Sequence, residues 1–457
     1  MKNGYLYTFS AEPFRLMTEQ SHLLSEAPYK QPAAATPRWS WSSFLVFRYL
    51  FSYVAFFLWS FSGFFAPLTL PLSFTSNAFW SAVIPWIATQ VLQEPAPALY
   101  SDGDGLGQWI QVFGCGVLAL ISTLIWSICD RRRQNYDKLY AWLHLTLRYA
   151  VGIVMFFYGL AKVFHLQMLP PHLAKLIQPY GDSSPTSLLW IMLGSSAAYS
   201  AFTGLVEVLG GVLLFNRRTT TLGALISFGA MVHVLVLNMS YDVSVKIWSM
   251  NWMAFAALLL ATDFRRLVDV FVLNRPTEKV AFPVLFKSAK SKRGWGVAGL
   301  VCLAITLGIK LLGLASGYNR SYRQTPVALY GIYEVESFTL NETRLPPLLT
   351  DEQRWKALVI ERSGLASVLG MNGDPEDFLT RIDAENRTVS FLPNPDQTQT
   401  AAGATRLAYD PRIIQKRYRR AVESGSGTEE VLSFTQSSGN RLTLAGPWQG
   451  ESIEVQL

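Results

Sequence analysis

The sequence has few cysteines and no signature of a common enzyme class. Its three cysteines, Cys115, Cys129 and Cys302, lie within or at the ends of long apolar segments and form no CxxC pair. This distribution supports neither a disulfide framework nor a dithiol redox centre. GxSxG, HExxH and P-loop motifs are also absent, and GDGLG at 103–107 follows no predicted strand, so we expect a loop there. These absences argue against a hydrolase, a metalloenzyme or a nucleotide enzyme.

The sequence also has few charged residues and many apolar ones. Of the 457 residues, 16% are charged and 50% are hydrophobic, with a mean hydropathy of +0.22. An average soluble chain is less apolar than this. Residues 1–317 carry 24 Lys and Arg against 14 Asp and Glu, whereas residues 318–457 carry 15 against 18. The positive charge therefore belongs to loops that flank membrane spans, and we expect no nucleic-acid partner.

Runs of about 20 apolar residues predict a polytopic α-helical membrane protein. The seven predicted spans are 42–66, 108–129, 142–165, 188–215, 219–239, 244–262 and 295–315. Ala78 to Leu92 is apolar but short, and we interpret it as an interfacial or re-entrant segment. Basic loops follow the second, fourth and sixth spans, which predicts a cytoplasmic N-terminus and an extracytoplasmic C-terminus. The first forty residues lack a signal-peptide pattern, so the first span is expected to remain as an anchor.

After the seventh span the hydrophobic period changes from helical to alternating. Eight short segments with turn signals between them predict an extracytoplasmic all-β domain, a meander or small barrel. Its opening, LYGIYEVESF at 329–338, is similar to the first strand of a lipocalin-type barrel. The basic segment 412–421 is interpreted as an inserted helix or surface loop with a solvated face, rather than an anionic-lipid contact. The predicted strands are 329–340, 355–362, 365–371, 377–384, 387–393, 430–436, 440–446 and 452–457.

Charged side chains within the spans are the first candidates for a functional site. A charge at mid-depth costs at least ~2.5–3.5 kcal/mol on insertion scales, so something must compensate for it. Arg48 and Tyr49 recur one hundred residues later as Arg148 and Tyr149, which hints at an internal repeat. Glu207 is predicted at a depth that Arg148 can reach, so we expect Glu207 to pair with Arg148 or Arg48. This inner cluster is either a structural ion pair or a proton-handling or ligand-anchoring site.

Lys162 lies about 21 Å further along the helix that carries Arg148, near its extracytoplasmic end. Polar residues of nearby loops would form a pocket with it, in which Lys162 belongs with Asp242. Snorkelling of Lys162 within an aromatic belt is the alternative. His165 and His233 are weak candidates for haem ligation. The ligand-binding candidates are Tyr158, Lys162, His165, Asp182, Tyr241, Asp242 and Lys246, and no metal site is expected.

Two segments carry a resemblance to a known family. RYAVGIVMFFYGLAKVF at 148–164 and GLVEVLGGVLLFNRRTTTLGALI at 204–226 resemble the larger DoxX-like membrane proteins. The resemblance implies a DoxX-type four-helix core with extra spans on either side, and a β-tail found in longer members. The family pattern falls on Tyr158, Gly159, Lys162, Glu207, Gly210 and Gly211. The resulting domains are 1–40 (cytoplasmic), 41–130 (first spans), 131–278 (core), 279–317 (basic loop and last span) and 318–457 (β-domain).

Three hypotheses for function follow, and whether the chain is an enzyme stays open. The first, which the resemblance implies, is a redox-associated, quinone-linked subunit that has no metal or thiol centre and works with an oxidoreductase partner. The second is a carrier in which the β-domain captures an apolar molecule and passes it to the helices. The third is a structural scaffold. Membrane lipids are expected partners, no covalent cofactor is expected, and the resemblance implies a bacterial inner membrane. The oligomeric state stays open.

Overall fold

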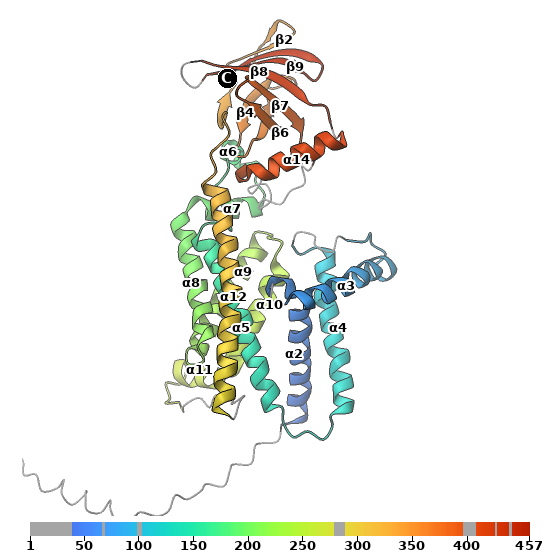
Figure 1. Cartoon of the computed structure of the whole chain (residues 1–457), viewed down its shortest axis with the longest axis vertical. Coiled ribbons are helices and arrows are strands. Elements are labelled where there is room, and N and C mark those ends of the chain that lie inside the picture. Colours follow the sequence, from blue (N-terminus) through green and yellow to red (C-terminus); the bar gives the residue numbers. More distant parts are fainter. Residues whose placement is uncertain are drawn as a thin grey trace, which may run out of the picture.

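Helices and strands separate into two regions of the computed structural model, with the β-domain at one end of the helical part (Figure 1). The structure describes residues 39–65, 69–97, 103–277, 288–395, 408–425, 427–437 and 441–457. The predicted cytoplasmic segment 1–40 therefore lies almost entirely outside the described residues, as does the first part of the predicted basic loop.

The helical part supports a multi-pass membrane protein. Six described helices are long and apolar enough to cross a membrane, and the apolar helix α10 (Lys246–Ala261) has 16 residues. These seven helices correspond to the seven predicted spans, except that α8 accounts for only the second part of 188–215. The six are α2 (Trp41–Ser60), α4 (Leu106–Cys129), α5 (Asp137–Val163), α8 (Ala197–Phe215), α9 (Thr220–Ser240) and α12 (Ala289–Tyr322). A short amphipathic helix, α11 (Phe264–Phe271), follows α10.

The predicted continuous span 188–215 is wrong. It is divided into α7 (Pro185–Ser195) and α8, with Ser196 between them. The Ser196 side chain accepts a hydrogen bond from the Tyr199 backbone N–H, which is the geometry of a helix N-cap. An apolar composition alone does not reveal such a break, because Ser is tolerated within membrane helices as well.

The segment predicted to be interfacial belongs to a longer helix. Helix α3 (Leu70–Trp86) continues as a π-helical turn, η3 (Ile87–Val91), and runs across the direction of α2 and α4 (Figure 1). Phe74 and Trp86 on this helix are exposed. Its orientation and its exposed apolar residues are those expected of an interfacial helix.

Glycines allow α5 and α8 to pack with their backbones in contact. A Cβ atom added to Gly204 would lie 2.4 Å from the Gly159 carbonyl oxygen, and one added to Gly211 would lie 2.7 Å from the Gly152 carbonyl oxygen. The two contacts are seven residues apart on each antiparallel helix, so they lie along one face. Small residues at such a seam are the usual means of close packing between membrane helices. Helices α9 and α10 complete a four-helix bundle with α5 and α8, around a buried core that includes Trp252.

The β-domain is one antiparallel sheet of ten strands curled into a half-barrel. The order is β1-β4-β5-β6-β7-β8-β9-β10-β2-β3. β1 and β2 are separated by two residues yet pair with β4 and β10 respectively, which draws the two sides of the sheet together. The strands are β1 (Gly331–Glu334), β2 (Ser337–Leu340), β3 (Thr343–Leu345), β4 (Trp355–Ile360), β5 (Leu365–Gly370), β6 (Pro375–Asp383), β7 (Thr388–Pro393), β8 (Glu430–Gln436), β9 (Leu442–Trp448) and β10 (Glu451–Gln456).

Aromatic side chains fill the inside of the half-barrel. The Trp355 and Trp448 ring centroids are 4.8 Å apart, and Phe391 lies 5.3 Å from Trp448. All eight predicted strand segments are confirmed; the first is divided into β1 and β2, and β3 was not predicted. Segment 412–421 is confirmed as a helix, α14 (Pro411–Ser424), which packs Ile414 and Tyr418 against the sheet.

Candidate functional site

A cavity of about 630 Å³ lies in the half of the four-helix bundle nearest the β-domain. Side chains of α5, α8, α9 and α10 form its walls, and α7 together with the segment linking α5 to α7 covers it. Most of its lining is apolar. A cavity of this size and character is typical of a binding site for a small molecule or cofactor.

A buried ion pair forms one wall of the cavity. Lys162, in the last turn of α5, binds the Glu207 carboxylate of α8 directly through its Nζ atom. The two residues are only 7% and 2% exposed. Because the Cα–Cβ bond of a helical residue tilts toward the helix N-terminus, the Lys162 side chain extends back along α5 to the level of Glu207. Ser200 donates a hydrogen bond of 3.0 Å to the Lys162 carbonyl oxygen and strengthens this helix contact.

The predicted pairing of Glu207 with Arg148 or Arg48 is wrong. Arg148 donates from Nε and Nη2 to the Leu214 carbonyl oxygen at 3.1 and 3.0 Å, and Arg48 donates to the Asp130 carbonyl oxygen at 2.8 Å. Both carbonyls lie at the C-terminal end of a neighbouring helix, where the helix dipole is negative. The hydrogen-bond donors of each arginine are therefore used by a carbonyl at a helix end, and Glu207 pairs with Lys162 instead.

Several polar atoms of the cavity wall have no partner within the described part of the chain. They are Glu207 Oε2, Gln167 Oε1, and the indole Nε1 atoms of Trp190, Trp248 and Trp252. The Tyr158 phenol also lines the cavity, within interaction range of Glu207 and the Trp248 indole. Unpaired buried polar groups are rare and costly. Two acceptors and three donors on the wall of one apolar cavity are the pattern expected of a site that receives a polar head group.

The other predicted site residues lie around the cavity without lining it. His165 follows α5, and burial lowers the pKa of its imidazole. Asp182 is exposed in the short helix η4 (Tyr180–Asp182). Asp242 binds Lys246 at 2.6 Å on the surface, so its predicted association with Lys162 is wrong. Tyr241 belongs to the same turn between α9 and α10.

The GDGLG segment closes the cavity beside this turn. Residues 103–105 form the predicted loop, and α4 begins at Leu106. Gly103 has a φ of +84°, and any Cβ there would collide with the Ser244 carbonyl, so glycine is required. Asp104 accepts hydrogen bonds from the backbone N–H groups of Lys246 and Ile247 at 2.6 and 3.0 Å. The loop therefore caps α10 and holds the turn against the cavity.

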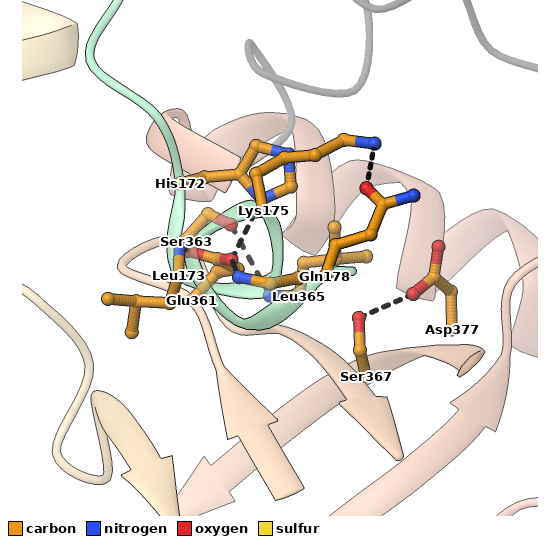
Figure 2. Close-up of polar contacts among 10 residues, drawn as sticks. His172, Leu173, Lys175, Gln178, Glu361, Ser363, Leu365, Ser367 and Asp377 are labelled. Atoms are coloured by element: carbon orange, nitrogen blue, oxygen red, sulfur yellow. Dashed lines mark hydrogen bonds and ion pairs between the residues drawn. The ribbon is translucent and has the colours of Figure 1, made fainter. Parts of the chain in front are cut away.

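The β-domain holds the other part of the cover (Figure 2). Glu361, directly after β4, accepts hydrogen bonds from the backbone N–H groups of Leu173 and Ala174 at 3.2 and 2.9 Å. Its carboxylate also lies 2.9 Å from Nδ1 of the buried His172. These partners begin the short helix α6 (Leu173–Ile177), in the segment whose Gln167 faces the cavity. One carboxylate of the β-domain thus positions the cavity cover.

Part of this site was not predicted from the sequence. Trp190, Trp252 and Gln167 were not among the predicted site residues, and His233, considered for haem, lines the cavity on α9. The spacing of Trp248 and Trp252, one helical turn apart, is the one signal that pointed to a shared face. Within the described ranges, no three His, Cys, Asp or Glu side chains form a group that a metal ion requires.

Comparison with known proteins gives one relative. No family model matches the chain, and no solved structure matches it. The uncharacterized protein YwoB of Bacillus subtilis (strain 168) is 30% identical over 135 residues, which cover 28% of this chain and 80% of YwoB. The chain belongs to the family of YwoB. The similarity to YwoB covers less than a third of the chain, and it assigns no activity because YwoB is itself uncharacterized.

Proposed function

We propose that the chain is a DoxX-like, redox-associated membrane subunit whose four-helix bundle binds the head group of a quinone. The observation that carries the proposal is the apolar cavity with unpaired donors and acceptors on its wall. A quinone would supply reversible two-electron, two-proton chemistry there. An oxidoreductase partner subunit supplies the electrons in this proposal, because the chain has no cysteine pair and its three cysteines are free.

Different wall residues would provide the hydrogen-bond donors, the acceptor and the compensating charge that such a site requires. The indole N–H groups of Trp190 and Trp252 donate hydrogen bonds to ring carbonyl oxygens, and Glu207 Oε2 accepts one from a ring hydroxyl. Lys162 holds the other carboxylate oxygen and offsets its negative charge. Since Oε2 is free of protein partners among the described residues, Glu207 is the group placed to take up or return a proton.

The distribution of positive charge supports the orientation that we propose. Arg133 follows α4, Arg217 follows α8 and Arg265 lies in α11, all at the end of the helical part opposite the β-domain (Figure 1). The positive-inside rule makes that end cytoplasmic. The chain would then be a multi-pass protein of the cell membrane with its N-terminus inside and its β-domain extracytoplasmic.

The carrier hypothesis has less support. A carrier that captures its cargo in the β-domain needs an empty apolar interior, whereas Trp355, Phe391 and Trp448 fill this half-barrel. The helical cavity is the better candidate for a ligand of either kind.

Purification in mild detergent, with mass spectrometry of co-purified lipids and proteins, tests the proposal. We expect a quinone with the wild-type protein, and at least a tenfold smaller amount with Glu207→Gln and with Trp252→Phe. Trp41→Phe, which changes an exposed tryptophan of α2, is the matched control and should retain the quinone. Repeated absence of quinone from the wild type, or equal amounts in all variants, would show that the proposed site is wrong.

A further inference from the structure

The cavity has a side opening between α8 and α9. The exposed residues that line the cavity include Phe202 on α8, which is 62% exposed, and Gly229 and His233 on α9. A Cβ atom added to Gly229 would meet no other atom within 4 Å. The outer surface and the cavity are therefore continuous at this point of the helix pair.

The two helices are in close contact in the halves that lie away from the β-domain. A Cβ atom on Gly210 would lie 2.7 Å from Ser227 Oγ, and one on Gly223 would lie 2.8 Å from the Leu214 backbone nitrogen. No comparable glycine contact joins α8 to α9 beside the cavity in the described residues. The opening therefore lies beyond the close glycine contacts, where residues of both helices line the cavity.

The opening faces the apolar surroundings of the helices. Leu205 and Leu209 on α8, and Leu225 and Val236 on α9, are exposed around it, and both helices are apolar enough to cross a membrane. The face of the cavity toward the β-domain is covered by Gln167, Met168 and Gly103. A ligand that uses the side opening arrives from the lipid phase, with an apolar chain that stays in contact with lipid.

The charges of the wall limit the head group of such a ligand. Lys162 and Glu207 neutralise each other, and the unpartnered polar atoms of the other wall residues described belong to uncharged amide and indole groups. An ionic head would enter a low-dielectric site without a counter-charge, which costs several kcal/mol per ion. The wall therefore favours a neutral head with hydrogen-bonding oxygens over a phosphate or a carboxylate.

We infer that the cavity takes a neutral-headed amphiphile directly from the lipid phase, through the opening between Phe202 and Gly229, with its apolar tail lying in that opening. This inference rests on the proposed function, since it assumes that the cavity binds a head group. It adds the entry route, the need for a tail and the selection against charged heads.

Binding to three probes tests this inference, with the full-length protein in neutral phosphatidylcholine nanodiscs and empty nanodiscs subtracted. The probes are a benzoquinone with a decyl tail, the same ring without a tail, and decanoate. We expect the wild type to bind the tailed quinone at least tenfold more tightly than either other probe. Gly229→Trp, which fills the opening, should lose that tenfold advantage. Gly313→Trp is the matched control on α12, where an added Cβ also meets nothing, and it should bind as the wild type does.

A second variant keeps the test decisive if Gly229→Trp does not fold. Phe202→Ala widens the opening and should speed dissociation of the tailed quinone severalfold, with the tail-less ring unaffected. Equal binding of tailed and tail-less quinone to the wild type, preferential binding of decanoate, or unchanged behaviour of the folded Gly229→Trp or Phe202→Ala variant would overturn the inference alone. Failure of both quinones to bind the wild type would overturn the proposed function as well.

Discussion

Removing one partner of the Lys162–Glu207 pair should harm the protein far more than removing both charges. Lys162→Met leaves the Glu207 carboxylate buried and uncompensated, and Glu207→Gln leaves the Lys162 ammonium in the same condition. Breaking a buried pair in this way typically costs about 3–5 kcal/mol. The double variant Lys162→Met/Glu207→Gln has no buried charge, and its side chains keep nearly the same volumes.

The size of the expected loss in unfolding free energy follows from the burial of Lys162 and Glu207. At 7% and 2% exposure neither charge reaches water, so each single variant should lose about 3 kcal/mol or more of unfolding free energy. Replacing both partners of such a pair is often nearly neutral. With about 3 kcal/mol lost in each single variant and almost none in the double variant, the coupling energy between the two positions should be about 6 kcal/mol in magnitude, whereas independent positions show less than about 0.5 kcal/mol.

A double-mutant cycle measures this coupling. The fraction of folded protein is followed in mixed micelles as the share of denaturing detergent increases, for the wild type, both single variants and the double variant. A control cycle uses Lys246→Met and Asp242→Asn, a surface pair with an exposed carboxylate, which should show about 0–1 kcal/mol. Additive effects at Lys162 and Glu207 would refute the reasoning, because they would mean that the pair is absent from the folded protein.

The remaining predictions concern helix packing, the cavity cover and the β-domain. Gly204→Leu should separate α5 from α8 and destabilise the protein by at least about 2 kcal/mol, because its Cβ meets the Gly159 carbonyl oxygen at 2.4 Å, while Gly313→Leu should be nearly neutral in the same detergent titration. Glu361→Ala should raise amide hydrogen exchange in residues 172–175 without unfolding the helices; unchanged exchange would contradict its role in holding the cover. Burial raises the pKa of Tyr418 to about 12 from 10, so its neutral phenol stabilises the fold fully below pH 10 and this contribution is lost as the pH rises through 12. The melting temperature of Tyr418→Phe should consequently fall less than that of the wild type over this range, and parallel curves would show that Tyr418 does not cause the loss.

The β-domain and its helix were predictable because their residues alternate or repeat locally. A strand with one buried face has apolar residues at every second position, and α14 places Ile414, Tyr418 and Ala421 on one helical face. The sheet order was not predictable. The pairing of β1 with β4 and of β2 with β10 joins residues more than twenty and more than one hundred positions apart, and no local pattern specifies such partners.

The sequence by itself determined that long apolar helices carry a few charged residues, and that Tyr158, Lys162 and Glu207 are unusual among them. The tertiary structure decided which charges meet. The break at Ser196 and the glycine contacts between α5 and α8 set the depth of Glu207, while helix ends satisfy Arg148 and Arg48. The choice of partner rests on the relative position of two helices to within a few ångströms, because Coulomb energy and hydrogen bonding depend on distance, whereas hydropathy records only composition.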